Sequence, residues 1–249
     1  MTTNNWFYVP YPLKDKKIKV FCFPHAGGNA YFFRDWGVKF APSAEIIGIN
    51  FPGRSTHFYA APINEMGKLV CELIKVLIPL ISDGSPYIFL GHSLGALVAY
   101  ETALKIRMLS LPMPKQLILS SYKAPHIRYT DELISNLSNI EIANNLSKKY
   151  GYFDQEIINN EALLKFVMVA LRADIMIHES YNYKASSPLD IPFYIYGGSE
   201  DYHISSESLR EWKRHTLSLF SLHEIEGNHF FLFENNKVYL DHIKKHVIE

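Results

Sequence analysis

Short, nearly continuous apolar runs that alternate with segments of helical periodicity constrain the fold of this chain most strongly. A run such as Ile18 to Phe23 carries apolar side chains at odd and even positions, so a strand made from it is buried on both faces. Strands of this kind, separated by helices, are typical of an α/β fold with a mostly parallel central sheet and helices on both faces. We expect strands at 18–23, 45–51, 87–90, 116–120, 193–196 and 219–225.

One long connection interrupts this alternation. Residues 121–191 contain helical patterns but no strand pattern, whereas a simple crossover between parallel strands needs only about a dozen residues. We interpret the segment, at roughly 123–187, as a helical lid inserted over the carboxyl edge of the sheet, where such sheets bind ligands. We expect helices in the insertion at 131–137, 140–150 and 162–177, and in the rest of the chain at 63–81, 94–107, 206–215 and 238–247.

Length and charge exclude several classes of protein. A chain of 249 residues with 48% hydrophobic residues suits a single domain, 1–249, with a sizeable core. Lys plus Arg number 25, as do Asp plus Glu, so no overall positive field attracts nucleic acid. The longest apolar stretch, 63–81, is interrupted by charged residues and predicts a packed helix, not a membrane span.

The cysteines and the first ten residues bear on the compartment. Cys22 and Cys71 are too few for a disulfide framework, and both lie in apolar stretches, where we expect reduced, buried thiols. Residues 1–10 contain no basic segment followed by an apolar run, so we expect no signal peptide. These features predict a cytoplasmic protein.

The segment Gly91-His92-Ser93-Leu94-Gly95 follows a predicted strand and precedes a predicted helix. This context is typical of a nucleophile elbow, a turn so tight that its neighbours are glycine and that raises a serine hydroxyl above the sheet edge. Ser93 is therefore the predicted nucleophile.

A serine nucleophile needs a histidine base and a carboxylate that orients it, and in this architecture they follow in the order Ser, Asp or Glu, His. His229 lies in a loop directly after the last predicted strand and is the expected base. Asp201, just past the strand at 193–196, is the expected carboxylate, and Glu200 is its rival.

Backbone N–H groups complete such a site, because negative charge develops on the substrate carbonyl oxygen. Leu94, the residue after the nucleophile, should supply one N–H, and Ala26 in the loop after the first strand should supply the other. His25, in the same loop, could line the site without being its base.

At this point the sequence resembles the stand-alone type II thioesterases that accompany nonribosomal peptide and polyketide synthases, within the α/β-hydrolase superfamily. The resemblance covers nearly the whole chain. It is carried by Phe-Pro-His-Ala-Gly-Gly (23–28), Phe-Pro-Gly-Arg (51–54), Gly-His-Ser-Leu-Gly-Ala-Leu (91–97), Leu-Arg-Ala-Asp (171–174), Gly-Gly-x-x-Asp (197–201) and Gly-Asn-His-Phe-Phe-Leu (227–232).

The resemblance implies hydrolysis of acyl groups from the phosphopantetheine arm of acyl or peptidyl carrier proteins, by a monomer that needs no cofactor or metal of its own. Apolar lid residues should include those that contact the acyl chain, Phe166 among them, although most of them simply pack the lid: Leu133, Leu137, Leu163, Phe166 and Val167. Two other functions stay open. The same residues could hydrolyse acyl-CoA or small esters, and a non-catalytic module that binds carrier proteins is the third reading.

Overall fold

The computed structural model describes residues 5–14, 18–128, 130, 132–151, 153–234 and 236–248. Within them, seven strands form one sheet in the order β1-β3-β2-β4-β5-β6-β7. Neighbouring strands run parallel, except that β1 pairs antiparallel with β3. The strands are β1 (Phe7–Tyr8), β2 (Lys19–Phe23), β3 (Glu45–Ile49), β4 (Tyr87–His92), β5 (Leu117–Ser120), β6 (Phe193–Gly198) and β7 (Phe220–Ile225). The mostly parallel sheet is confirmed, and the short edge strand β1 is an addition to the prediction.

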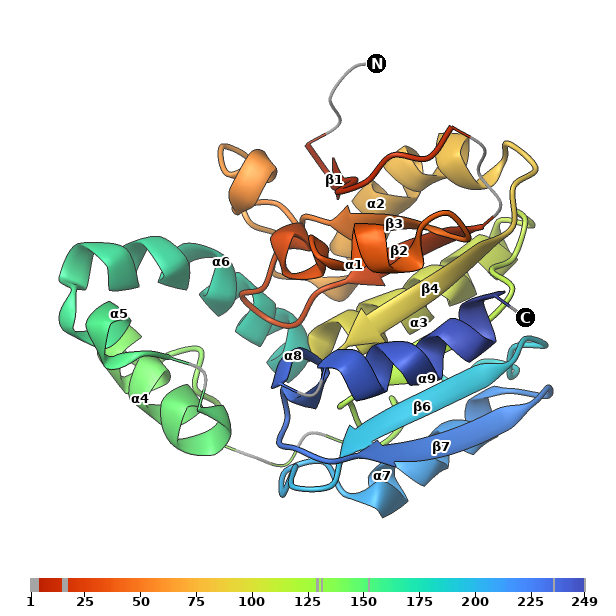
Figure 1. The fold of residues 1–249 in the computed structure, drawn as a ribbon. Coiled ribbons are helices and arrows are strands. Elements are labelled where there is room, and N and C mark those ends of the chain that lie inside the picture. Colours follow the sequence, from red (N-terminus) through yellow and green to blue (C-terminus); the bar gives the residue numbers. More distant parts are fainter. Residues whose placement is uncertain are drawn as a thin grey trace.

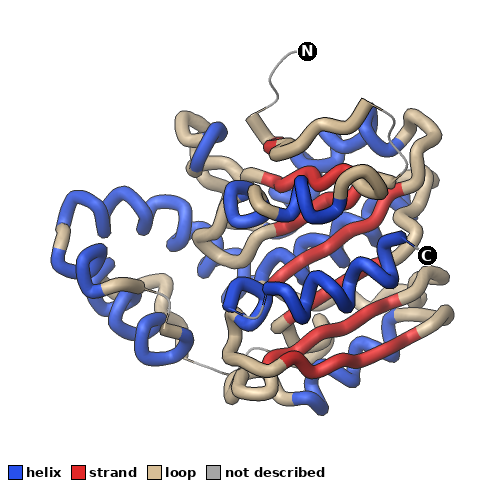
Figure 2. Tube along the Cα trace, viewed as in Figure 1, coloured by secondary structure: helices blue, strands red, loops and turns tan. Residues whose placement is uncertain are grey.

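Helices cover both faces of this sheet, as Figures 1 and 2 show. The α-helices are α1 (Trp36–Phe40), α2 (Met66–Ile81), α3 (Leu94–Met108), α4 (Asn139–Tyr150), α5 (Gln155–Asn159), α6 (Glu161–Ser180), α7 (Ser206–Arg210), α8 (Phe231–Glu234) and α9 (Asn236–Ile248). Three short 3₁₀ helices within the described residues are η1 (Ala30–Phe33), η2 (Ser55–His57) and η3 (Glu211–His215).

The apolar runs separate two cores, one on each face of the sheet. Along β2, Phe21 and Phe23 point into the core beneath α2 and α3, while Val20 and Cys22 point into the core beneath α1 and α9. Successive side chains of a strand point to opposite faces, so a run without polar interruptions fills both layers. This explains why the central strands carry no alternation of polar and apolar residues.

Helices α4, α5 and α6 form the insertion between β5 and β6, and they lie beyond the carboxyl ends of the strands (Figure 1). The insertion has its own hydrophobic cluster, which includes Ile142, Leu164 and Met168. The helix expected at 131–137 was wrong: residues 132–137 are turns and irregular chain, and Asp131 lies outside the described residues. Glu179 of α6 accepts hydrogen bonds from the N–H groups of Ile134 and Ser135 and holds this segment without a helix.

The cysteines differ in exposure. Cys22 is buried in β2, as expected, but Cys71 is exposed on α2, which corrects the expectation that both are buried. Cys71 lies on the face of α2 that turns away from the buried Leu69 and Val70. Across the described part of the chain, no helix combines the length and apolar character required to cross a bilayer.

Candidate active site

The turn between β4 and α3 places Ser93 at the carboxyl edge of the sheet. Ser93 has φ +53° and ψ −125°, a strained backbone for a non-glycine residue. A methyl group at Gly91 would lie 2.4 Å from the carbonyl oxygen of Gly95, and one at Gly95 would lie 2.2 Å from the carbonyl oxygen of Phe23. Both glycines are therefore required by close backbone approach, as the elbow predicts.

Ser93, His229 and Asp201 form one hydrogen-bonded series. His229 Nδ1 lies 2.7 Å from Asp201 Oδ2, and His229 Nε2 lies 3.0 Å from Ser93 Oγ. A carboxylate oxygen can only accept, so Nδ1 carries the proton and Nε2 accepts from the Ser93 hydroxyl. The side chains of His229 and Asp201 are 7% and 1% exposed, so this series is shielded from water.

The loops that carry Asp201 and His229 are fixed to each other. The N–H of Glu200 donates to the carbonyl oxygen of Gly227 at 2.8 Å. A methyl group at Gly198 would lie 2.2 Å from the carbonyl oxygen of Asn228, so only glycine permits this contact. Glu200, the rival carboxylate, is exposed, whereas Asp201 is buried against the histidine.

The neighbouring histidine of the elbow points away from the nucleophile. His92 is fully buried, and its Nδ1 lies 2.9 Å from Ser120 Oγ. Desolvation, followed by the nearby His229 and His25, lowers the pKa of His92 well below its usual value. A neutral, buried imidazole held by Ser120 fills a structural position.

The predicted oxyanion loop lies beside the nucleophile. Ala26, Leu94 and Ser93 line the same cavity. Leu94 is the first residue of α3, so its N–H has no acceptor within the helix and points out of the helix N-terminus. His25 is 3% exposed, and burial, with smaller contributions from His229 and Arg54, lowers its pKa to about 3. His25 therefore lines the site as a neutral imidazole.

A buried ion pair that the sequence did not reveal adjoins this loop. The Arg54 guanidinium contacts both carboxylate oxygens of Asp174, at 2.5 and 2.7 Å. Asp174 also accepts from the N–H of Gly27 at 2.7 Å, and Arg54 donates to the carbonyl oxygen of Gly28 at 3.1 Å. The two motifs 51–54 and 171–174 thus meet at the loop that follows β2.

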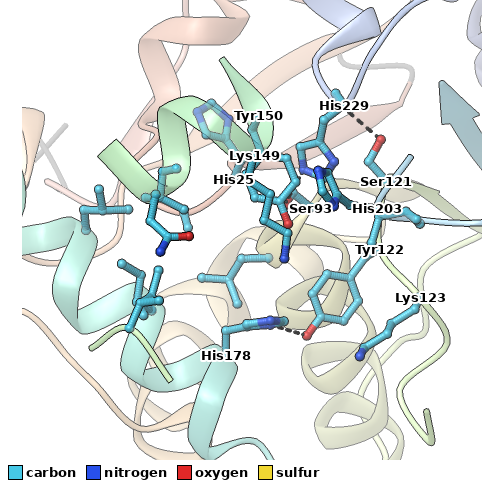
Figure 3. Close-up of a pocket in the computed structure, with 18 of the residues that line it drawn as sticks. His25, Ser93, Ser121, Tyr122, Lys123, Lys149, Tyr150, His178, His203 and His229 are labelled. Atoms are coloured by element: carbon cyan, nitrogen blue, oxygen red, sulfur yellow. Dashed lines mark hydrogen bonds between the residues drawn. The ribbon is translucent and has the colours of Figure 1, made fainter. Parts of the chain in front are cut away.

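The insertion and the sheet edge enclose a cavity of about 600 Å³ around Ser93 (Figure 3). Tyr122, after β5, and His178, on α6, point toward one another across it, with their OH and Nδ1 atoms 2.8 Å apart. Tyr150, at the end of α4, lies over the His229 ring at a centroid distance of 4.5 Å. No sequence signal singled out these three residues. The apolar lining from the insertion comprises Ile134, Leu146, Leu171 and Ile175.

The lid residues expected to contact the acyl chain lie elsewhere. Phe166 is 55% exposed and stacks on Phe58 at 5.0 Å, outside the residues that line the cavity. Leu133 and Leu163 are exposed, whereas Leu137 and Val167 pack into the core of the insertion. Phe166 and Leu171 are five positions apart, which places them about 140° apart around the axis of α6, so they face different directions.

Among the described residues, no group of three or more His, Cys, Asp or Glu side chains is arranged to hold a metal ion. The fold and the Ser-His-Asp series together define a serine hydrolase of the α/β-hydrolase class.

The sequence model of the thioesterase domain family matches residues 18–247, so the chain belongs to that family. Gramicidin S biosynthesis protein GrsT of Aneurinibacillus migulanus is 32% identical over 233 residues, which cover 93% of this chain and 90% of that protein. Linear gramicidin dehydrogenase LgrE of Brevibacillus parabrevis is 30% identical over 236 residues, which cover 93% and 88%.

Among solved structures, the type II thioesterase BorB from the borrelidin biosynthetic cluster superposes with a TM-score of 0.89 at 27% identity and covers 99% of both chains. The resemblance to type II thioesterases that the motifs indicated is therefore confirmed, as are the α/β-hydrolase fold and membership of a hydrolase family.

Proposed function

We propose that this protein is a serine thioesterase that hydrolyses acyl groups from the phosphopantetheine arm of carrier proteins, for editing or release in nonribosomal peptide or polyketide biosynthesis. The observation that carries the proposal is the hydrogen-bonded series of Asp201, His229 and Ser93 in a chain of the thioesterase family. Similarity to proteins named for gramicidin S biosynthesis and for the borrelidin cluster supports the class of pathway.

The first chemical step forms an acyl-enzyme. Ser93 Oγ attacks the thioester carbonyl carbon, and its proton passes to His229 Nε2, 3.0 Å away. Asp201 holds the imidazole and stabilises its charged form. The N–H groups of Ala26 and Leu94 donate hydrogen bonds to the carbonyl oxygen and stabilise the negative charge that develops on it.

The carbon–sulfur bond then breaks, and the phosphopantetheine thiol leaves with the proton from His229. A thiol has a pKa near 8.5, so it leaves more readily than an alcohol and needs less help from the general acid. Water next attacks the acyl-serine and gives a proton to His229 Nε2. The bond between the acyl carbon and Ser93 Oγ then breaks, His229 returns the proton to Oγ, and the carboxylic acid is released. The cycle ends with Ser93 as it began.

The proposed partner is an acyl or peptidyl carrier protein, which brings its own phosphopantetheine, so the hydrolase requires no separate cofactor. We further propose that it acts as a monomer in the cytoplasm, that residues 1–249 form a single domain, and that residues 123–187 act as a lid. The helices of the insertion that line the cavity support the lid assignment.

Hydrolysis of acyl-CoA or small esters is the second candidate, because the same three residues act on any acyl group. A cavity walled by the insertion, with Lys123 and Lys149 in its lining, supports a larger substrate than a small ester. The name of the Brevibacillus relative includes a dehydrogenase activity. That activity does not fit this chain, because the Ser-His-Asp series suits acyl transfer and not hydride transfer.

Comparing kcat/KM for one acyl group on a carrier protein, on coenzyme A and on nitrophenol tests the proposal. We expect the carrier-bound thioester to be hydrolysed with the highest kcat/KM. Equal or faster hydrolysis of the coenzyme A thioester would favour the second candidate. Binding to the carrier protein with no turnover of any of the three substrates would favour the non-catalytic module.

A further inference from the structure

A buried ion pair joins the helical insertion to the turn after β3. Arg54 and Asp174 lie 120 residues apart, yet their side chains are 7% and 1% exposed and share two hydrogen bonds, at 2.5 and 2.7 Å. An ionised group buried without a partner is strongly unfavourable, so neither side chain can leave the other at low cost. The bidentate geometry fixes the orientation of both groups as well as their separation.

The pair holds the loop after β2 at two points. Asp174 Oδ2 accepts from the N–H of Gly27 at 2.7 Å, and Arg54 Nη1 donates to the carbonyl oxygen of Gly28 at 3.1 Å. Gly27 has φ +73°, a conformation that favours glycine, so the chain bends here toward the ion pair. The residue directly before this bend is Ala26.

These contacts fix both peptide groups that flank Ala26. The peptide group between His25 and Ala26 is held because the carbonyl oxygen of His25 accepts from the N–H of Gly28 at 2.9 Å. The next peptide group is held because the N–H of Gly27 donates to Asp174. A trans peptide is planar with its N–H opposite its carbonyl, so fixing these bonds fixes the direction of the Ala26 N–H.

Arg54 also offsets the negative charge of Asp174. The Asp174 carboxylate contacts the N–H of Gly27, the residue after Ala26, so it would repel negative charge on a substrate oxygen held by Ala26. The guanidinium contacts both oxygens of that carboxylate and offsets its charge. The loop therefore gains a strong acceptor for Gly27 without a net negative charge beside the nucleophile.

We propose that Arg54 and Asp174 are positioning residues, which aim the Ala26 N–H at the developing oxyanion and keep its surroundings electrically neutral. The inference deepens the proposed function and rests on it in one respect, namely that Ala26 receives the oxyanion. Arg54 and Asp174 belong to the motifs 51–54 and 171–174, which take no direct part in the chemistry of Ser93, Asp201 and His229.

The variants Arg54→Gln, Asp174→Asn and the double variant test this with p-nitrophenyl acetate, a substrate that needs no carrier protein. We expect Arg54→Gln to lower kcat by about 10²-fold with KM nearly unchanged, as for loss of an oxyanion donor. The double variant should be more active than Arg54→Gln, because it removes the carboxylate charge and retains an amide oxygen for Gly27. Asp83→Asn is the matched control: it breaks the 2.5 Å Lys19–Asp83 pair, outside the site, and should leave kcat unchanged.

Two results would overturn the inference. One is a lower melting temperature in Arg54→Gln and Asp174→Asn with kcat per folded molecule unchanged, which a purely structural pair would give. The other is a double variant whose loss equals the product of the single losses, because independent effects add in free energy. If the Gln variant does not fold, Arg54→Lys keeps the buried charge but not the bidentate contact, and kcat should fall while KM stays.

A readout without any substrate separates this inference from the proposed function. Amide hydrogen exchange at Gly27 should be faster in Arg54→Gln than in wild type, and unchanged exchange would contradict the positioning role. If wild type cleaves p-nitrophenyl acetate but not an acylated carrier protein, the proposed substrate is wrong and the positioning role is unaffected.

Discussion

At the scale of single residues, the environment decides which of two adjacent carboxylates can orient the histidine. Asp201 is buried, and its Oδ2 lies 2.7 Å from His229 Nδ1, while its Oδ1 accepts from the N–H of His203 at 3.2 Å. Glu200 is exposed, and its backbone, not its side chain, contributes a bond to the His229 loop. Of these two adjacent carboxylates, one contacts His229 and the other faces solvent.

We predict that Asp201→Asn lowers kcat by about 10⁴-fold, because an amide nitrogen favours the tautomer of His229 that cannot take the Ser93 proton. Glu200→Gln is the control and should retain wild-type kcat. Steady-state hydrolysis of a thioester by the three proteins measures this. Equal losses in both variants, or a loss in Glu200→Gln alone, would refute the assignment.

Residue-level reasoning from sequence located Ser93, Asp201 and His229 because each follows a strand, and parallel strands end at one edge. The pairing of Arg54 with Asp174 was out of reach. Nothing local brings together two residues 120 positions apart, and the motif Leu-Arg-Ala-Asp (171–174) does not indicate a partner for Asp174. Phe166 lies outside the cavity lining, because apolar character does not say which face of α6 meets the cavity.

Among the elements, the turn between β4 and α3 is limited by backbone contacts. Gly95 lies so close to the end of β2 that a methyl group would sit 2.2 Å from the Phe23 carbonyl oxygen. The carbonyl cannot move without disturbing β2, which pairs with β3 and β4. The elbow and the loop that carries Ala26 are therefore one packed unit.

We predict that Gly95→Ala lowers the free energy of unfolding by about 1–3 kcal/mol, through overpacking, and lowers kcat as well. Gly67→Ala is the matched control. Gly67 is exposed in the first turn of α2, and its nearest contact for a methyl group is at 3.6 Å, so the change should stabilise by up to about 1 kcal/mol. Urea unfolding measures both. A Gly95→Ala protein as stable as wild type would contradict the contact.

The insertion supplies part of the cavity wall. Leu171 and Ile175 of α6 line the cavity, one turn apart, whereas Phe166 faces outward against Phe58. If the acyl chain lies in this cavity, removing a wall side chain enlarges the space available to it.

We predict that Ile175→Ala shifts the chain-length preference toward longer acyl groups, and that Phe166→Ala leaves the preference unchanged. Competition between carrier proteins bearing short and long acyl groups, followed by mass spectrometry, measures the preference. A shift in Phe166→Ala without one in Ile175→Ala would place the acyl chain outside the cavity.

Element boundaries followed from sequence where the apolar pattern was long, as in the central strands and α6. The sequence does not predict the two-residue strand β1 or the short helix α5, because segments this short show no periodic pattern of apolar residues. Residues 132–137 are held by Glu179 and by Arg172, which donates to the carbonyl oxygen of Ser135. Tertiary bonds therefore override the weak helical pattern there.

Over the whole molecule, buried histidines connect stability to pH. Burial lowers the pKa of His25 to about 3 and that of His215 to about 4, and lowers the pKa of His92 well below its usual value. Burial also lowers the pKa of His57 and His223. The unfolded chain binds protons on these side chains as pH falls through about 6.5, while the folded protein does not.

We therefore predict that the free energy of unfolding falls as pH decreases from about 6.5 to about 4, by up to about 1.4 kcal/mol per pH unit for each deeply buried histidine. Urea unfolding at several pH values measures this slope. His215→Gln should give a shallower slope, because it removes one of these groups. A free energy of unfolding that is constant or rises between pH 7 and pH 5 would contradict the account.

Hydrolysis at Ser93 of a thioester carried by a partner protein is the central claim for the molecule as a whole. Intact mass spectrometry of an acylated carrier protein, incubated with wild type or with Ser93→Ala, tests it directly. We expect rapid loss of the acyl mass with wild type and retention with Ser93→Ala. Equal loss with both proteins would show that Ser93 is not the nucleophile, and retention with both, while acyl-CoA is still cleaved by wild type, would contradict the carrier-protein substrate.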